Sequence, residues 1–445
     1  MFGHSPVEMW GGVECTINRV GDEFYDQFAM SGHRVRMERD LELFAELGLT
    51  NLRTCLHWEH FARSGKWEDF DRCMHAVERC GMSPIVGLVH HGSGPADTDL
   101  LDHDFPEKLA AYAAKVAQRY PWAFDYTPIN EPQTTGRFAC LYGHWYPHHR
   151  NMRSYVRALA NQIKGIVLSM AAIRNVQPGA RLIHTEDGGV THASPILESY
   201  RIDREHRRWL GLDLLCGRVE RQHPLFQFLI DNGLDQKEIL WFAEHPCPPS
   251  VVGMNYYVTS DRFLDHRVEL YPDYFRGGDS GDEPLVDIEA VRVSHHGIFG
   301  ARTILTQAWE RYKLPVAITE AHLGCSPDQQ VRWLSEICRQ AHQAYFDGVD
   351  VRAVTAWGLL GLYNWCDLCT RDSGHYEPGV FDVSGGTPLE TPLSDLVRRL
   401  ARRMPLPSAA LSNAGWWELN SRFTMPRPRL SLQQSLAHNQ ARFRR

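Results

Sequence analysis

The sequence lacks the features of membrane, secreted and low-complexity proteins. Its longest stretch without charged or strongly polar residues, 353–363, is well short of the roughly 20 apolar residues that a membrane-spanning helix needs. Residues 1–10 have neither a basic start nor an apolar run, so we expect no signal peptide. The 25 prolines and 35 glycines are scattered, which excludes a collagen-like or wholly disordered chain.

Cysteine is present without a disulfide pattern. The 11 cysteines are odd in number and widely spaced in a chain of 445 residues, which predicts mostly reduced thiols and a cytoplasmic protein. Cys366 and Cys369 have the spacing of a redox or zinc half-site. No second pair follows them, so ordinary buried or rim thiols are the favoured interpretation.

Negative charge outweighs positive charge outside the C-terminal end. Residues 401–445 hold eight arginines and one glutamate, a charge of +7, and the rest of the chain carries −14. An acidic body argues against a nucleic-acid partner. We expect a main domain over residues 1–403 and a basic tail over 404–445. The tryptophans of the tail should pack on the main domain. The segment with the last arginines should either be unstructured or bind a protein partner.

Short β-branched segments alternate with longer segments of helical periodicity. The predicted strands are 7–15, 50–56, 84–90, 124–129, 180–185, 251–257, 316–319 and 351–357. The main helical segments are 37–47, 69–80, 106–119, 154–176, 299–312 and 329–346. Eight alternating units predict parallel strands with crossover helices, closed into a (β/α)8 TIM barrel. The Asp- and Gly-rich connection 261–293 is expected to be a surface loop at the barrel mouth.

Polar residues gather where the predicted strands end, which is the face of such a barrel that carries an active site. Seven predicted strands have polar or aromatic residues of this kind at or near their ends. They are Arg53 and Trp58, His90 and His91, Asn130 and Glu131, Glu186 and Asp187, Asn255 to Tyr257, Glu320 and His322, and Trp357. A single residue of this kind is most often a capping residue. Seven together indicate a functional site.

Two carboxylates stand out, Glu131 at the fourth predicted strand and Glu320 at the seventh. A carboxylate pair flanking a glycosidic bond is the basic requirement of sugar hydrolysis. Arg53 by its charge and Tyr256 by a hydrogen bond are expected to keep Glu320 ionised. Glu131 follows the neutral Asn130 and has no such partner, so we expect it to stay protonated.

These residues resemble the motifs of glycoside hydrolase family 1, the retaining β-glycosidases of clan A. Asn130-Glu131-Pro132 resembles the acid/base motif of that family, and Ile318-Thr319-Glu320 resembles the start of its nucleophile motif. Four more matches keep the order of the family, namely Arg53 with Trp58, Leu88-Val89-His90, Gly-Met-Asn-Tyr-Tyr at 253–257, and Trp-Gly-Leu-Leu at 357–360 with Trp365. The resemblance covers roughly residues 7–400.

The resemblance implies a retaining β-glycosidase that hydrolyses a small carbohydrate substrate without metal or organic cofactor. Glu131 would be the general acid/base and Glu320 the nucleophile, about 5–5.5 Å apart as retention requires. The implied substrate contacts are Asn130 to the 2-hydroxyl, His90 to the 3-hydroxyl side, Trp357 as a stacking platform, and Arg53, Tyr256 and Asn255 around the carboxylates.

Three departures concern positions that contact the nucleophile or the sugar hydroxyls. Ala321 and His322 follow Glu320, where the family has Asn-Gly. The first strand offers Glu14 in place of a glutamine, and Asn364 stands in place of a glutamate before Trp365. A divergent member whose glycone is not plain glucose is therefore expected.

Other classes of protein stay open. A metal-dependent barrel hydrolase would use some of the 23 histidines, but neighbours on a strand point to opposite sides, which disfavours His-His pairs as metal ligands. A barrel that binds sugar or a partner without turnover is compatible with the altered nucleophile motif. A transglycosidase, in which an alcohol intercepts the glycosyl-enzyme, is compatible with every motif.

Overall fold

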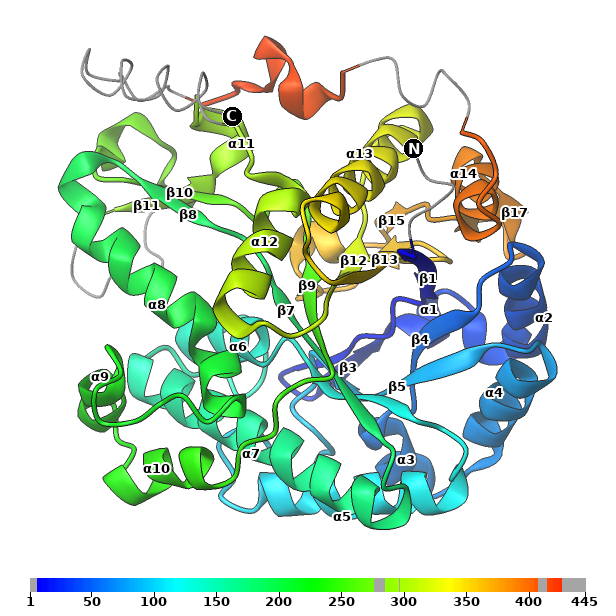
Figure 1. Cartoon of the computed structure of the whole chain (residues 1–445), viewed down its shortest axis with the longest axis horizontal. Coiled ribbons are helices and arrows are strands. Elements are labelled where there is room, and N and C mark those ends of the chain that lie inside the picture. The colour runs from blue at the N-terminus through cyan, green and yellow to red at the C-terminus, as the bar shows by residue number, and fades with distance from the viewer. Residues whose placement is uncertain (1–5, 276–284, 296, 407–413, 426–445) are drawn as a thin grey trace.

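The structure is a computed structural model that describes residues 6–275, 285–295, 297–406 and 414–425. Eight parallel strands close into a barrel in the order β1-β13-β12-β9-β7-β6-β5-β4 (Figure 1). The strands are β1 Glu8–Gly12, β4 Asn51–Cys55, β5 Ser83–His90, β6 Asp125–Asn130, β7 Arg181–Asp187, β9 Val251–Asn255, β12 Val316–Ala321 and β13 Val351–Ala356. Each one overlaps a predicted strand, so the TIM barrel is confirmed.

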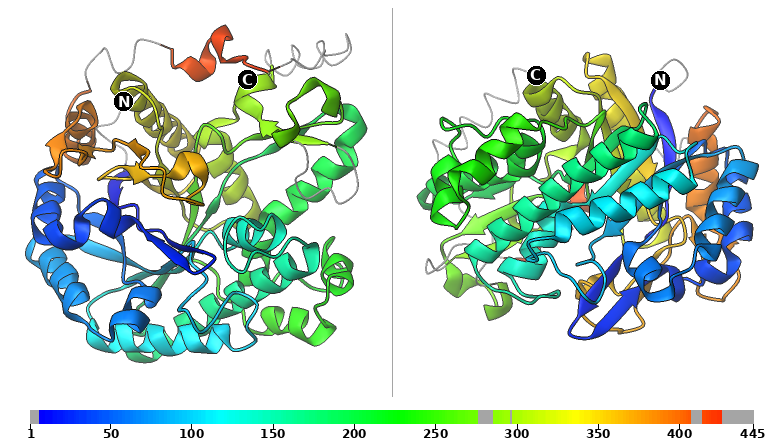
Figure 2. Two further views of the ribbon diagram at one scale, coloured as in Figure 1. Left: turned by 180° about the vertical axis from the view of Figure 1, so that it is seen from behind. Right: turned by 90° about the horizontal axis from the view of Figure 1, so that it is seen from below.

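Helices surround the barrel on its outer side (Figure 2). Six match predicted segments: α2 His33–Glu46, α4 Glu68–Arg79, α5 Phe105–Arg119, α7 Met152–Val176, α12 Gly300–Tyr312 and α13 Pro327–Phe346. The others are α1 Gln27–Met30, α3 Trp58–Ser64, α6 Pro132–Gly136, α8 Glu198–Leu215, α9 Phe226–Asp231, α10 Gln236–Glu244, α11 Ala290–Val293 and α14 Pro392–Ala401. Proline opens α5 and α13 within the first turn, where its missing N–H costs nothing.

Helix α7 is the one helix in the described ranges that is long and apolar enough to cross a membrane. The most apolar part of this helix is 72% buried inside the protein, where α7 packs along α5. This is the environment of a core helix.

The barrel strands are buried on both faces, as parallel strands covered by helices must be. The barrel interior contains a small cluster of buried side chains, Trp10, Ile85, Ile183, Ala317 and Ala353. Glycine is required near one end of β1, because a Cβ at Gly12 would lie 2.4 Å from the Trp357 ring. This close approach brings Trp357 against the end of β1.

The connection 261–293 is more ordered than expected. Its described part contains β10 Arg262–Asp265 and β11 Val286–Glu289, which form a three-stranded sheet with β8 Thr191–Ala193. The prediction of a surface loop is therefore wrong for these strands. Short ribbons are also formed by β2 Ile17–Val20 with β3 Glu23–Asp26, by β14 Leu362–Tyr363 with β15 Tyr376–Glu377, and by β16 Phe381–Asp382 with β17 Leu389–Glu390.

The described part of the tail runs from α13 to α11 (Figure 1). Trp417 is buried and packs edge-on against Trp333 of α13, with ring centroids 5.1 Å apart. Arg422 is also buried and donates to the carbonyl oxygens of Val291 and Ser294. The closing arginines, Arg442, Arg444 and Arg445, lie outside the described residues.

Candidate active site

Glu131 and Glu320 lie at the same end of the barrel, on strands separated by β7 and β9. Glu320 belongs to β12, and Glu131 follows β6 directly, before Pro132 opens α6. Glu131 has φ +45°, a left-handed conformation that a non-glycine residue rarely adopts and that is concentrated at functional sites. The exposed fractions of Glu131 and Glu320 are only 5% and 2%.

Glu320 is bound by a cation and a phenol. Arg53 Nη1 lies 3.1 Å from Glu320 Oε1, and the Tyr257 hydroxyl donates to Glu320 Oε2 at 2.5 Å. Burial raises the pKa of Glu320 to about 7, and Arg53 and Tyr257 act against that rise because both stabilise the ionised form. Arg53 also donates to the Asn130 side-chain oxygen at 3.0 Å, which links the two strand ends.

Glu131 has a different environment. Asn255 donates to Glu131 Oε1 at 2.6 Å, and His91 lies 3.9 Å from Glu131 Oε2. Burial is the main cause that raises the pKa of Glu131 well above its ordinary value, and the negative charge of Glu320 adds to it. Burial and mutual repulsion therefore disfavour ionisation of both carboxyl groups together, and Arg53 and Tyr257 favour the ionised form at Glu320.

The prediction that Tyr256 orients Glu320 is wrong, because its neighbour Tyr257 does so. The Tyr256 hydroxyl donates to Asp261 at 2.8 Å and accepts from the backbone N–H of Gly300. Its ring stacks on Trp333 in the helical layer. Strand β9 ends at Asn255, so the two tyrosines follow the strand and turn to opposite sides of the barrel wall.

Asn130 is the centre of a hydrogen-bond network beneath the carboxylates. Its amide nitrogen donates to His90 Nε2 at 3.1 Å and to His91 Nε2 at 3.3 Å, and its oxygen accepts from Thr185 at 2.7 Å. Burial lowers the pKa of His91 to about 3 and that of His90 well below its ordinary value, so both rings are neutral. Neutral rings accept from Asn130 through Nε2, which leaves their Nδ1 protons for Cys15 and Thr135.

The His90-His91 pair corrects one step of the sequence argument. His91 lies just beyond β5 with φ +57°, so the strand alternation no longer applies and both rings approach Asn130. In the described ranges, the residues grouped closely enough to hold a metal ion are instead Cys15, Cys55 and His57, all buried. This grouping gives no support to the alternative of a metal-dependent hydrolase built on the His-His pairs.

Trp357 and Glu14, two of the predicted substrate contacts, form a hydrogen bond with each other. The indole of Trp357 is stacked on His90, with ring centroids 5.4 Å apart and an interplanar angle of 10°, and Arg53 lies over it. Its Nε1 donates to Glu14 at 3.2 Å, and burial raises the pKa of Glu14. The roles of Trp357 and Glu14 toward a sugar stay predictions.

The two remaining predicted contacts lie in the loop after β14. Asn364 bonds within this loop, since its amide donates to Asp372 and accepts from Ser373. Trp365 packs edge-on against His91, with centroids 5.4 Å apart. Sequence reasoning missed Tyr257 as a partner of Glu320, His91 as a partner of Asn130, and Trp145, whose ring centroid lies 5.3 Å from that of His91. Tyr257 and His91 lie beside residues that the motifs had already indicated, whereas no motif pointed to Trp145.

Comparison with known proteins places the chain among sugar-cleaving enzymes. No protein-family model matches it. It is 21% identical over 403 residues to the 6-phospho-beta-glucosidase of Clostridium longisporum, covering 79% of this chain and 78% of that protein. It is 23% identical over 411 residues to beta-glucosidase A of Thermotoga maritima, covering 84% and 85%.

Solved structures agree on the fold. The beta-glucosidase from Thermotoga maritima in complex with methoxycarbonyl-substituted glucoimidazole superposes with a TM-score of 0.73 and 15% identity, covering 92% of this chain and 100% of that one. The curated relatives and the shared fold agree with the six ordered motifs of the sequence. The chain is thus a divergent relative of the β-glycosidases of glycoside hydrolase family 1.

Proposed function

We propose that this protein is a retaining β-glycosidase that uses Glu131 as the acid/base and Glu320 as the nucleophile. One observation carries the proposal: of two buried carboxyl groups at one end of the barrel, only Glu320 has an arginine and a phenol as partners. A double displacement needs one ionised and one protonated carboxyl group, and this difference in partners provides it.

The first step forms a covalent intermediate. A Glu320 oxygen attacks the anomeric carbon as the bond to the leaving oxygen breaks, and Glu131 transfers its proton to that oxygen. Tyr257 and Arg53 hold the attacking carboxylate, which loses its negative charge as the new ester forms. In the second step Glu131 takes a proton from water, the water oxygen attacks the anomeric carbon, and Glu320 leaves as a carboxylate.

The glycone is proposed to differ from unmodified glucose. Asn364 stands where the family has a glutamate, and its amide is bound to Asp372 and Ser373 of its own loop. A residue held in this way offers fewer free atoms to a sugar hydroxyl than a glutamate aimed into the site. A kinetic panel of 4-nitrophenyl β-glycosides in which the glucoside has the highest kcat/KM would contradict this.

The test of the mechanism is intact-protein mass after incubation with 2-deoxy-2-fluoro β-glycosides that carry an activated leaving group. Slow deglycosylation makes the glycosyl-enzyme accumulate, so wild type should gain the mass of one fluorosugar and Glu320→Gln should gain none. Peptide mapping should place the sugar on Glu320. A label on another residue would overturn the assignment. If wild type gains no label from any of the donors, the result would favour a barrel that binds sugar without turnover.

The pH dependence of kcat/KM is expected to have its optimum above the range of ordinary glutamates. Activity needs ionised Glu320, whose pKa is raised to about 7, so activity should rise as pH approaches and passes 7. It should fall again where Glu131, whose pKa burial raises well above its ordinary value, loses its proton. Initial rates between pH 5 and pH 10 check this, and an acid limb centred near the ordinary glutamate pKa would contradict it.

Two neighbouring tyrosines provide a matched pair of variants. Tyr257→Phe removes the donor to Glu320 and is expected to lower kcat/KM about a hundredfold with little change in stability. Tyr256→Phe leaves buried Asp261 with one donor fewer, so we expect a loss of about 1–3 kcal/mol in unfolding free energy and nearly unchanged kcat. Steady-state kinetics and urea denaturation separate the two, and the reverse pattern would restore Tyr256 as the partner of Glu320.

A further inference from the structure

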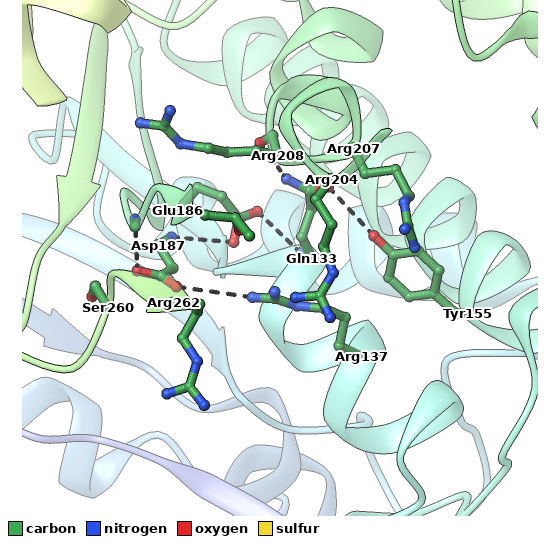
Figure 3. A pocket seen from close by; sticks show the side chains of 12 residues that line it. Gln133, Arg137, Tyr155, Glu186, Asp187, Arg204, Arg207, Arg208, Ser260 and Arg262 are labelled. Carbon is green, nitrogen blue, oxygen red and sulfur yellow. Dashed lines mark hydrogen bonds and ion pairs between the residues drawn. The ribbon is translucent and has the colours of Figure 1, made fainter. Parts of the chain in front are cut away.

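A cavity lined by five arginines lies beside Glu131. It is bounded by α8, by β7 with the loop after it, and by the start of β10, and its volume is about 60 Å³ (Figure 3). Its arginines are Arg137, Arg204, Arg207, Arg208 and Arg262. At the 10–15 Å³ that one water needs, this volume holds about four to six water-sized groups, which is the size of a phosphate.

Arginine is rarely buried, and here three are buried on one helix. Arg204 and Arg207 are 7% and 6% exposed, and the side chain of Arg208 is 8% exposed. They lie three and four residues apart on α8, which places them on one face of the helix. That face is directed at the cavity and toward Glu186 and Asp187 of β7 (Figure 3).

The arginines of the cavity are paired with carboxylates at its edge. Asp287 is shared, since it pairs with both Arg204 and Arg262. Arg207 pairs with Asp203 and Arg208 with Glu205, while Arg137 lies 3.9 Å from Asp187. Burial raises the pKa of Glu186 to about 7, so that carboxyl group is only partly ionised at neutral pH.

Two guanidinium donors of this cavity have no acceptor in the part of the chain that the structure describes. Arg137 Nε and Arg208 Nε are both buried without a hydrogen-bond partner. A buried donor without an acceptor costs free energy, so a site with two of them favours a ligand rich in acceptor oxygens. Phosphate and carboxylate groups are such ligands.

The position of the cavity relates it to one part of the substrate. Gln133, two residues after Glu131, lines it, and its backbone N–H donates to Glu186. Glu131 protonates the leaving oxygen, so the leaving group extends on the Glu131 side of the site. In the opposite region, near Asn364 and Trp365, the exposed Arg371 is paired with Asp367.

We propose that this arginine cavity binds an anionic group, a phosphate or a carboxylate, carried by the leaving group of the glycoside. The proposal deepens the proposed function, since it assigns the substrate class on the leaving-group side of the same site. A bound anion also disfavours ionisation of Glu131 and so keeps the acid protonated until the bond breaks.

The first test is calorimetric titration of the full-length protein with inorganic phosphate near pH 7.5. Wild type should bind phosphate with a millimolar or lower Kd, and Arg137→Gln should weaken binding about tenfold or more. Arg302→Gln is the matched control, because Arg302 is an exposed arginine on α12 paired with Asp347, and it should leave Kd unchanged. Thermal melts verify that each variant is folded. No measurable binding, or equal Kd in wild type and Arg137→Gln, would overturn the site whatever the glycosidase assays give.

The second test decides which part of the substrate the anion belongs to. In the trapped 2-fluoroglycosyl-enzyme the glycone position is filled and the leaving-group position is empty, so phosphate should bind with the same Kd as in free enzyme. Loss of binding on trapping would place the anion on the glycone and overturn the leaving-group assignment. With aryl glycosides that differ only by a phosphate on the phenol, the kcat/KM preference for the phosphorylated phenol should fall about tenfold in Arg137→Gln. If no adduct forms and no glycoside is cleaved, the proposed function fails, and phosphate titration still decides whether the cavity binds an anion.

Discussion

Replacement of Glu320 by glutamine is expected to lower kcat by about four orders of magnitude or more, the loss seen when a covalent catalyst loses its nucleophile. The amide of glutamine has the shape of the carboxylate but cannot form the glycosyl ester. Its oxygen can still accept from Tyr257, which donates to Glu320 Oε2 in the wild type. The loss should therefore appear in kcat for every substrate, measured by steady-state and single-turnover kinetics.

A matched set of variants separates chemistry from folding in this prediction. Glu320→Gln leaves buried Arg53 without its carboxylate, and Glu320→Asp keeps the charge while it withdraws the oxygen by about one methylene length. Glu320→Asp should fold and still lose about a hundredfold in kcat, because a displacement near 1 Å has that effect. Glu59→Gln alters another fully buried glutamate, with pKa raised to about 7, and should change kcat little. Glu320→Gln with wild-type kcat would exclude Glu320 as nucleophile.

The barrel could be predicted because its eight strands are short, β-branched and separated by helices with clear periodicity. The predicted ends of these strands were less accurate. The first strand was predicted to reach residue 15, but it ends at Gly12, so Glu14 lies beyond it. The sheet of β8, β10 and β11 was missed for a physical reason. Its strands are three or four residues long, and β10 pairs with the distant β8, Arg262 opposite Thr191, so local pattern alone does not identify them.

That Glu131 and Glu320 lie together could be predicted, because parallel strands bring their carboxyl ends to one end of a barrel. The choice between Tyr256 and Tyr257 could not, because both follow the last residue of β9 and their directions depend on the backbone after the strand. The register between β9 and β12 also shifts between Ile318 and Glu320, which no sequence pattern indicates.

The arginine cavity could not be predicted from the sequence. Arg204, Arg207 and Arg208 resemble a solvated helix face in sequence, and only the fold shows that α8 turns this face toward β7 and β10. Two of the lining residues, Glu186 and Asp187, had been noted as a loaded strand end. Their partners come from distant segments, and arginine at those positions carries no local signal of burial.

Replacement of Glu131 by alanine is expected to have an effect that depends on the leaving group. Alkyl glycosides need a proton on the leaving oxygen and should lose about 10²–10⁴-fold in kcat/KM. A 2,4-dinitrophenyl glycoside has a leaving group that departs without protonation, so its first step should change little. Its second step should be slow, because no general base activates water, and the glycosyl-enzyme should accumulate as a burst of dinitrophenolate.

Azide then separates the two carboxylates by stereochemistry. In Glu131→Ala a small anion can enter the vacated space and attack the glycosyl-enzyme from the face opposite Glu320, so added azide should restore turnover and give a β-glycosyl azide. In Glu320→Ala the vacated space lies on the other face, and azide attack on a β-glycoside with an activated leaving group should give the α-glycosyl azide. Proton NMR of the anomeric hydrogen distinguishes the products. If Glu131→Ala gave the α-azide and Glu320→Ala the β-azide, the roles of the two carboxylates would have to be exchanged. The anomer shows which face azide enters, and so which carboxylate was removed.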